Sequence, residues 1–412
     1  MEAVWHIEAA RLIASLARLV RDVGLAEDLA QDAFVVALEQ WPKTGIPDDP
    51  GPWLRATAKH RAIDLLRRQE RYAAKLNLLG RDVEIQQEYA EKELDAELDD
   101  HIGDDLLRLM FTAAHPVLSA EAKAALTLRL LGGLTTREIA RAFLIPEPTA
   151  AQRIVRAKRA LADAGVRFEL PTPADLADRL SSVLEVIYLI FNEGYSATGG
   201  EDWARPALCQ EALRLGRVLT SLLPDEAEVH GLVALMELHA SRLPARTDDA
   251  GEPVLLPDQD RRLWDRLLVR RGLEALDCAE SLGGGSYTLQ AAIAACHARG
   301  RSADETDWPR IAALYEVLAY VQPTPVILLN RAVAVGMADG PERGLGLLAE
   351  LAEERALKEY PQLPAVRGEL LTRVGRHDEA RAEFARAAGL TRNKAERNLF
   401  LKRADDTSRR PG

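Results

Sequence analysis

The stretch LTTREIARAFLIPEPTAAQRIVRAKRAL, residues 134–161, predicts two short helices joined by a tight turn. Thr135 is followed three residues later by Glu138, which is the spacing of a capping box at a helix N-terminus. Pro148 falls in the first turn of the second helix, where its missing amide hydrogen is harmless. The stretch therefore predicts a helix-turn-helix, a motif that places its second helix in a DNA groove.

The second helix of this motif divides into an inward and an outward side. Ile154 and Ala157 are expected to face the first helix. The buried side of that first helix is expected to comprise Ile139, Ala140 and Phe143. A polar and basic side is left to meet a major groove and its phosphates. The residues expected to contact DNA are Thr149, Gln152, Arg153, Arg156, Lys158 and Arg159.

Length and composition constrain the rest of the chain. Its 412 residues predict two to four domains. The net charge of -11 argues against a general nucleic-acid binder, so any DNA contact must come from local basic segments. Apolar residues recur at three- and four-residue steps and strict alternation is almost absent. The expected fold class is therefore all-α.

The sequence also bears on compartment and cofactors. No apolar run approaches the roughly 20 residues that span a bilayer, and the N-terminal residues lack the order of a signal peptide. We therefore expect a cytoplasmic protein without a membrane partner. Cys209, Cys278 and Cys296 match no metal or redox spacing and are expected to be reduced and buried. We expect neither a metal nor a cofactor.

Charge is distributed unevenly along the first half of the chain. Residues 82–105 contain eleven acidic residues against one lysine, which predicts a flexible or loosely helical linker. Residues 55–75 contain seven lysines and arginines against two acids, and residues 137–167 contain seven against three. Two basic blocks joined by an acidic tether predict a two-point grip on an anionic partner.

An acidic helix precedes the first basic block. In GLAEDLAQDAFVVALEQW, residues 24–41, helical spacing gathers Leu29, Ala33, Val36 and Ala37 into a core face. A mainly acidic stripe lies roughly opposite, and a plain solvated surface is the alternative interpretation of it. The stripe consists of Asp28, Gln31, Asp32, Val35 and Glu39.

The next predicted helix, PGPWLRATAKHRAIDLLRRQERYAAK in residues 50–75, carries the first basic block. Pro52 is placed at its start, and Ala58, Ala62 and Leu65 form a narrow apolar seam. Its cations suit phosphate contacts, and the residues near its start suit stacking on an exposed base. A basic solvated helix is the alternative. The candidate DNA contacts are Trp53, Lys59, His60, Arg61, Arg67, Arg68, Arg71 and Lys75.

These motifs, in this order, resemble the extracytoplasmic-function sigma factors of bacterial RNA polymerase. An acidic AEDLxQDxF helix followed by a WLxxxARNxAIDxxRR helix is the usual pattern of their region 2. A GLT or GLS turn leading into a helix-turn-helix is typical of their region 4. The resemblance implies that Asp28, Gln31 and Asp32 face the clamp helices of the largest polymerase subunits. It implies that the second helix captures the minus-10 element, with Asp64 facing or supporting the strand.

The same resemblance implies that the helix-turn-helix binds the minus-35 element, and that core polymerase, including its beta flap, and promoter DNA are the partners. This chain departs from the family pattern at a few positions. His60 replaces the usual asparagine of the second helix, and Ala151 replaces a cation. Leu144 and Pro148 stand where glycines are usual. These departures predict a promoter preference different from that of typical members.

The end of the chain predicts stacked helix pairs. AVRGELLTRVGRHDEARAEFARAAGL, residues 365–390, has the spacings of a tetratricopeptide repeat. A second copy precedes it by about 35 residues, and a weaker third copy lies one further step back. Such repeats stack into an α-solenoid whose concave side binds peptide or protein. An ordinary helical domain without a groove is the alternative. The residues at the repeat spacings are Gly368, Leu371, Gly375, Ala380, Phe384 and Ala387, with Leu345 and Ala349 in the preceding copy.

The segment LEVIYLIFNEGYSATGG, residues 184–200, lies between the two halves. Its apolar run is followed abruptly by Asn192, Glu193, Gly194 and Tyr195. A helix is therefore predicted to end at Gly194. No second carboxylate, histidine or nucleophile lies nearby in sequence, which disfavours catalysis and favours a buried corner or an intramolecular contact. One group of extracytoplasmic-function sigma factors resembles this arrangement of NEGY motif and repeats, which implies that the extension modulates activity.

The expected organisation is a sigma factor with a fused regulatory extension. Region 2 is expected in residues 1–78, the acidic linker in 79–105, region 4 in 106–168, the NEGY extension in 173–285 and the repeats in 286–412. Such a protein is expected to act by binding polymerase and promoter DNA and not as an enzyme. Its repeats are expected to contact another part of the chain or a protein partner. A stand-alone helix-turn-helix regulator is the alternative, but it leaves the acidic stripe unexplained. An enzyme centred on the NEGY segment is a third interpretation.

Overall fold

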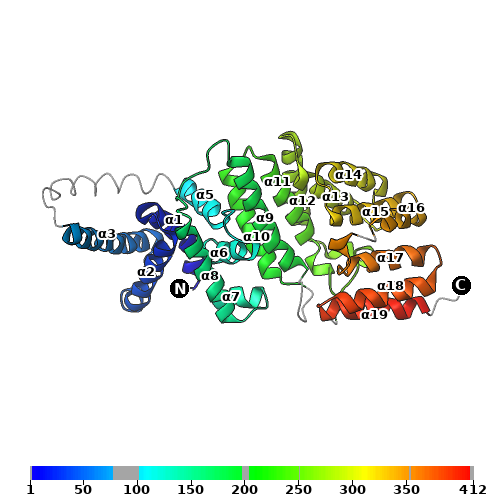
Figure 1. Cartoon of the computed structure of the whole chain (residues 1–412), viewed down its shortest axis with the longest axis horizontal. Coiled ribbons are helices and arrows are strands. Elements are labelled where there is room, and N and C mark those ends of the chain that lie inside the picture. The colour runs from blue at the N-terminus through cyan, green and yellow to red at the C-terminus, as the bar shows by residue number, and fades with distance from the viewer. Residues whose placement is uncertain (1, 78–101, 197–203, 250, 352–353, 409–412) are drawn as a thin grey trace. The chain divides into compact units, whose positions relative to one another are not determined.

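The chain is helical throughout the residues that the computed structural model describes, which are 2–77, 102–196, 204–249, 251–351 and 354–408 (Figure 1). Over these ranges the extended backbone is limited to an isolated antiparallel bridge between Thr247 and Pro253. The all-α prediction is confirmed. The chain divides into two compact units, residues 1–189 and 190–412. No helix in the described ranges is both long enough and apolar enough to cross a bilayer.

Unit 1 begins with three helices that pack against one another. They are α1 (Glu2–Val20), α2 (Val23–Thr44) and α3 (Pro50–Asn77). Fully buried alanines, among them Ala33 and Ala58, let the helices approach closely. The predicted core face of α2 is confirmed at Leu29, Ala33 and Ala37, whereas Val36 is only half-buried.

Four shorter helices follow in unit 1, and α8 packs on both α6 and α7. They are α5 (Ile102–Ala113), α6 (Ala120–Leu130), α7 (Thr136–Ala142) and α8 (Glu147–Asp163). The next helix, α9 (Leu176–Tyr195), contains the boundary between the units. Its first half is held to α5 and α6, because Arg179 donates to the Phe111 carbonyl at 2.9 Å and Lys123 donates to the Ser182 hydroxyl at 2.6 Å.

The predicted acidic linker is wrong at its C-terminal end. Residues 82–101 lie outside the described residues, but 102–105 form the first turn of α5. Asp105 is 1% exposed, accepts a hydrogen bond from Arg108 at 2.7 Å and pairs with Arg18 of α1 at 3.3 Å. Its two arginine partners explain why this acid is buried in a helix although its sequence neighbours predict a solvated tether.

Unit 2 is built first around α11, which is buried on almost every side because three other helices pack on it. The central helix α11 spans Ala227–Ala240, and the three that pack on it are α10 (Pro206–Leu222), α12 (Arg266–Ser281) and α13 (Ser286–Arg299). Three short 3-10 helices precede α12: η1 (Leu243–Ala245), η2 (Leu256–Asp258) and η3 (Arg261–Leu263). A Cβ atom on Gly272 would lie 2.7 Å from Leu238, so α12 can cross α11 only with glycine there.

The rest of unit 2 is a run of helices in which each packs on the next (Figure 1). They are α14 (Trp308–Val321), α15 (Pro325–Ala338), α16 (Pro341–Glu350), η4 (Arg355–Leu357), α17 (Gln362–Arg373), α18 (His377–Leu390) and α19 (Lys394–Ser408). Helices α15 and α16 cross so closely that a Cβ atom on Gly344 would lie 2.9 Å from the Cα atom of Gly336. Phe384 is fully buried and lies against Gly368, so it fills the space between α17 and α18 as predicted.

Candidate nucleic-acid and protein interfaces

The acidic stripe of α2 is a solvent-facing surface. Asp28, Asp32 and Glu39 are exposed, and Val35, in the middle of the stripe, is 51% exposed. Gln31 is only half-buried, and its side-chain amide donates to a carboxylate oxygen of Glu27 at 2.7 Å. The stripe thus offers acidic groups around one apolar side chain, a composition suited to a basic protein surface with an apolar centre.

The outer face of α3 combines an aromatic start with exposed cations. Trp53 is half-buried and packs edge-to-face on the buried Trp41, with ring centroids 5.2 Å apart. Arg61 is exposed and pairs with Asp32 of α2 at 3.0 Å. The remaining described candidates on this helix lie on its solvent side. His60, Asp64, Arg67 and Arg68 are exposed and Lys59 is half-buried, whereas the side chains of Arg71 and Lys75 lie outside the described residues.

The apolar seam of α3 is narrower than predicted. Ala58 and Ala62 are fully buried, but Leu65 is only half-buried. The helix starts at Pro50 rather than at Pro52. Among the described side chains of α3, the fully buried ones are Leu54, Ala58 and Ala62.

The helix-turn-helix has the predicted local structure. The Thr135 hydroxyl accepts from the Glu138 amide at 3.2 Å, and the Glu138 carboxylate accepts from the Thr135 amide at 2.7 Å, so the capping box is confirmed. Leu144 lies in the turn and has a φ of 50°, the left-handed conformation that glycine favours. Pro148 lies in the first turn of α8, as predicted.

The core of this motif matches the sequence interpretation with one correction. Ile139, Ala140, Ile154 and Ala157 are buried. Phe143 is only half-buried because it sits at the C-cap of α7, where the chain already turns away, and the smaller Ala142 is buried instead. Helical periodicity in the sequence wrongly included Phe143 in the buried face of α7, which ends at Ala142.

The outward side of α8 carries the candidate DNA contacts. Thr149, Gln152, Arg156 and Arg159 are exposed and Arg153 is half-buried. A shallow groove of about 370 Å³ separates this side from the start of α6. Lys158 differs from the others because its ammonium group pairs with carboxylates of α2, on Glu27 and, at 3.9 Å, on Asp28.

Sequence reasoning missed Glu27. It is 1% exposed, and Arg129 of α6 donates to its carboxylate at 2.6 Å. The available signal was helical spacing, because Glu27 lies three and seven residues before the buried Ala30 and Phe34. An acid on the core side of a helix requires partners from elsewhere in the fold.

The NEGY segment forms a packed corner at the end of α9. The helix ends at Tyr195, one residue beyond the prediction. A Cβ atom on Gly194 would lie 2.7 Å from the backbone nitrogen of Cys209, so only glycine fits there. Glu193 is ion-paired with Arg205. Asn192 is the exposed residue of the four.

The tyrosine of this corner is held by stacking. The Tyr195 ring lies parallel to that of Phe191, with centroids 5.8 Å apart, and the Arg246 guanidinium sits 3.6 Å from the Tyr195 centroid. Burial raises the pKa of the neighbouring Cys209 thiol to about 12, so it is not a nucleophile at neutral pH. These contacts describe a structural corner.

Two histidines near this corner, His239 and His297, are half-buried beside arginines. Burial, followed by Arg242, lowers the pKa of His239 well below its ordinary value, and the same two causes lower that of His297 to about 4. Both rings are therefore neutral at physiological pH. Within the described ranges, no three His, Cys, Asp or Glu side chains are grouped to hold a metal ion.

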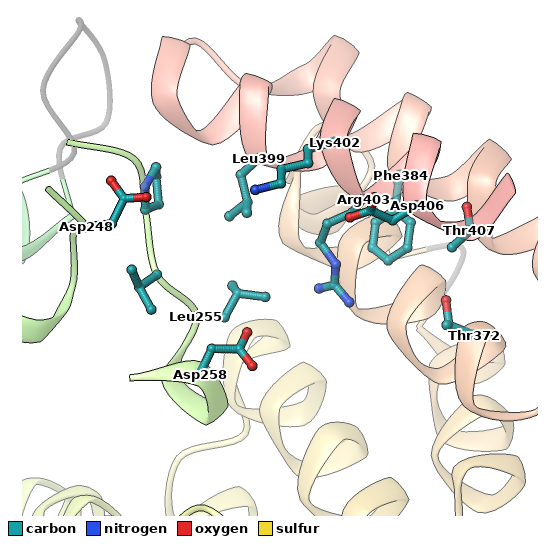
Figure 2. Close-up of a pocket in the computed structure, with 12 residues that line it drawn as sticks. Asp248, Leu255, Asp258, Thr372, Phe384, Leu399, Lys402, Arg403, Asp406 and Thr407 are labelled. Carbon is teal, nitrogen blue, oxygen red and sulfur yellow. The ribbon is translucent and has the colours of Figure 1, made fainter. Parts of the chain in front are cut away.

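Unit 2 also carries an open groove of about 430 Å³ between the segment 248–258 and the last helices (Figure 2). Leu255 and Asp258 lie on one side, and Leu399, Lys402 and Arg403 on the other. The lining mixes acids, cations and apolar side chains. Arg403 pairs with Glu369 and stands 4.6 Å from the centroid of the Phe384 ring.

Comparison with known proteins connects these surfaces to a family. Residues 7–72 match Sigma-70 region 2, and residues 108–161 match Sigma-70, region 4. The chain belongs to the sigma-70 family. It is a sigma factor that acts in promoter recognition and transcription initiation, together with core RNA polymerase and promoter DNA. We call residues 7–72 region 2 and residues 108–161 region 4.

The second half of this sigma factor matches a different family model. Residues 179–280 match a family of unknown function, DUF6596. An uncharacterized protein of Rhizobium meliloti (strain 1021) is 44% identical over 399 residues, which cover 96% of this chain and 93% of that protein. The combination of regions 2 and 4 with the helical unit 2 therefore extends to this relative over nearly its whole length.

Proposed function

We propose that this sigma factor is of the extracytoplasmic-function type and grips its promoter at two points. The acidic stripe of α2 docks on the polymerase clamp helices, the Trp53 end of α3 captures the minus-10 strand, and the outward side of α8 reads the minus-35 element. The observation that carries the proposal is the exposure of Asp28, Asp32 and Arg156 on helices whose opposite faces are buried. The family matches place these helices in regions 2 and 4.

The energetics of such a grip follow from charge. Contacts between the two basic blocks and phosphates supply affinity that falls with salt concentration, while base contacts supply the choice of sequence. The net charge of -11 weakens the binding of duplex DNA by the free chain. Docking on polymerase holds both blocks near the promoter and raises their effective concentration there.

We further propose that unit 2 modulates this activity. Its helices from α13 to α19 pack in sequence, with small residues at two crossings, which is the packing that tetratricopeptide-like repeats require. The groove of Figure 2 combines cationic, acidic and apolar side chains, which suits a protein segment. The exposed Asn192 at the NEGY corner is a further candidate contact.

Run-off transcription with core polymerase and genomic promoter fragments tests the main proposal. The wild-type chain should start transcription from specific promoters, and the double variant Asp28→Lys/Asp32→Lys should lose at least tenfold in core binding and in transcript. Glu185→Lys makes a matched charge reversal on an exposed side chain of α9 and should behave as wild type. Full activity in the double variant, with tight duplex binding by the free chain, would instead identify a stand-alone regulator.

A further inference from the structure

Three arginines gather in unit 2 just after α11. Arg242 and Arg246 flank η1, and Arg261 begins η3. Their side chains are buried, with exposed fractions of 6%, 6% and 7%. Burial lowers the pKa of Arg261, and the positive charge of Arg242 lowers it further. Burial also lowers the pKa of Arg246, with a smaller contribution from Arg242. We call Arg242, Arg246 and Arg261 the arginine cluster.

The Arg242 guanidinium lacks polar partners in the part of the chain that the structure describes. There its Nε atom is buried without a hydrogen bond, and its side chain forms no ion pair. It faces the rings of Tyr195 and Trp264, whose centroids lie 6.0 and 5.8 Å from its Cζ atom. These distances are at the outer limit of a cation–π interaction, so the rings offset little of the cost of burying the charge.

A second buried donor without a partner lies beside Arg242. Trp264 is 3% exposed, and its indole nitrogen makes no hydrogen bond within the described ranges. The Arg261 guanidinium stands 5.0 Å from the centroid of the same ring. Buried donors are almost always paired with acceptors in folded proteins. Two such donors beside positive charge therefore indicate a place for an acceptor that is itself negative.

Arg261 is held in place without being neutralised. It donates to the carbonyls of His297 and Gly300 at 2.7 and 2.8 Å, and to the Thr306 hydroxyl at 3.1 Å. These three acceptors carry no charge. Glu305 is near enough to raise the pKa of Arg261, against the larger lowering by burial, but its own side chain is exposed. The positive charge of Arg261 thus remains available to a ligand.

The cluster is not sealed from solvent. Tyr195, His239 and His297 are each only half-buried, and the Tyr195 and His239 rings lie 5.2 Å apart. Burial and then Arg242 lower the pKa of both histidines, so each ring is neutral and keeps one N–H donor. Because no hydrogen bond or ion pair with described residues holds the Arg242 guanidinium, it can turn toward an anion that enters.

We propose that Arg242, Arg246, Arg261 and the Trp264 indole form a binding site for the phosphate group of a small molecule. Near neutral pH a phosphate group carries a charge of about −1.5 to −2 and three acceptor oxygens, so it can pair with several guanidiniums and accept from the indole. A carboxylate carries a single charge and leaves more of the cluster uncompensated. This site is a property of unit 2 and does not depend on the proposed promoter grip.

Isothermal titration calorimetry of the full-length chain tests the site with inorganic phosphate and with methyl phosphate as probes. At constant ionic strength, the wild-type chain should bind at least one of them with a dissociation constant below about 1 mM. Acetate should bind at least tenfold more weakly. Tighter binding of methyl phosphate would assign the site to a phosphate monoester, and tighter binding of inorganic phosphate would assign it to the free ion. Equal or tighter binding of acetate overturns the assignment to phosphate.

Arg242→Met separates a ligand site from an arginine that only supports the fold. This variant should weaken phosphate binding at least tenfold. In phosphate-free buffer it should melt at the wild-type temperature or above, because it removes a buried charge that has no partner. A structural arginine predicts a lower melting temperature instead. Arg270→Met is the matched control, because that side chain is 69% exposed on α12, and it should leave binding and melting unchanged.

Fluorine NMR of the full-length chain labelled with fluorotryptophan reports on binding at this place. The signal that is missing in Trp264→Phe belongs to Trp264, and phosphate should shift it in the wild-type chain but not in Arg242→Met. No phosphate binding by wild type, equal binding by Arg242→Met, or binding that leaves the Trp264 signal unchanged overturns the site. A wild-type chain that binds phosphate but starts no transcription with core polymerase overturns the proposed function and leaves the site intact.

Discussion

Asp32 of α2 and Arg61 of α3 form an ion pair at 3.0 Å, so the helix proposed to dock on polymerase is tied to the helix proposed to hold the promoter strand. Their side chains are 60% and 42% exposed, and such a pair contributes less than about 1 kcal/mol to folding. We expect Asp32→Asn to leave the free energy of unfolding within about 1 kcal/mol of wild type but to weaken core binding several-fold.

Urea unfolding and a fluorescence titration with core polymerase measure the two effects. Arg61→Gln breaks the same pair and serves as the comparison, because Arg61 lies on the DNA-facing helix rather than in the acidic stripe. It should leave core binding in the absence of DNA near the wild-type value. Equal losses of core affinity in both variants would assign the effect to the ion pair and not to docking by Asp32.

The left-handed backbone at Leu144 predicts a stabilising substitution. Its φ is 50°, and a non-glycine residue in this conformation carries strain of about 1 kcal/mol. The side chain is 52% exposed, so little packing is lost on its removal. We therefore expect Leu144→Gly to raise the free energy of unfolding of unit 1 by about 0.5–1 kcal/mol. Thermal melts of the full chain measure this, and Ile145→Gly, a half-buried neighbour, should lower the melting temperature.

The helix-turn-helix was predictable because its determinants are local. The Thr135 cap and the proline in the first turn of α8 affect only backbone groups a few residues away. Their effect can therefore be predicted from the local sequence alone. The same holds for the acidic stripe of α2, where helical periodicity separates exposed acids from buried alanines.

The contacts between regions 2 and 4 were not predictable in this way. Glu27 and Asp105 are buried because arginines or a lysine from distant segments neutralise them. Glu27 and Arg129 lie too far apart in the sequence for a local pattern to pair them. Without its distant partners, each acid is expected to be exposed to solvent. The NEGY corner was predictable as a helix end, whereas the contact of Gly194 with Cys209 depends on a helix that follows later in the chain.

The packing of Phe384 predicts a large loss of stability on truncation. The ring is fully buried between α17 and α18 and lies against Gly368. Phe384→Ala removes that contact area and leaves a cavity, so we expect unit 2 to lose about 3–5 kcal/mol of unfolding free energy. Tyr320→Ala is the matched control, because that ring is 90% exposed and its loss should cost under about 0.5 kcal/mol. Urea unfolding followed by circular dichroism measures both.

The half-buried His297 predicts that unit 2 loses stability in mild acid. The pKa of His297 is lowered to about 4 by burial and then by Arg242, whereas an exposed histidine titrates near 6.5. The unfolded chain therefore binds a proton that the folded chain does not between these values. The stabilisation is complete above pH 6.5 and is lost as the pH falls toward 4, at about 1.4 kcal/mol per pH unit.

Unfolding free energies measured in urea between pH 4.5 and pH 7.5 test this dependence. His297→Phe retains a ring near Trp308, whose centroid lies 5.3 Å from that of His297, but removes the titrating group. The slope of stability against pH should fall in this variant by about 1.4 kcal/mol per pH unit. A wild-type slope in His297→Phe would show that the acid sensitivity of unit 2 arises from other groups.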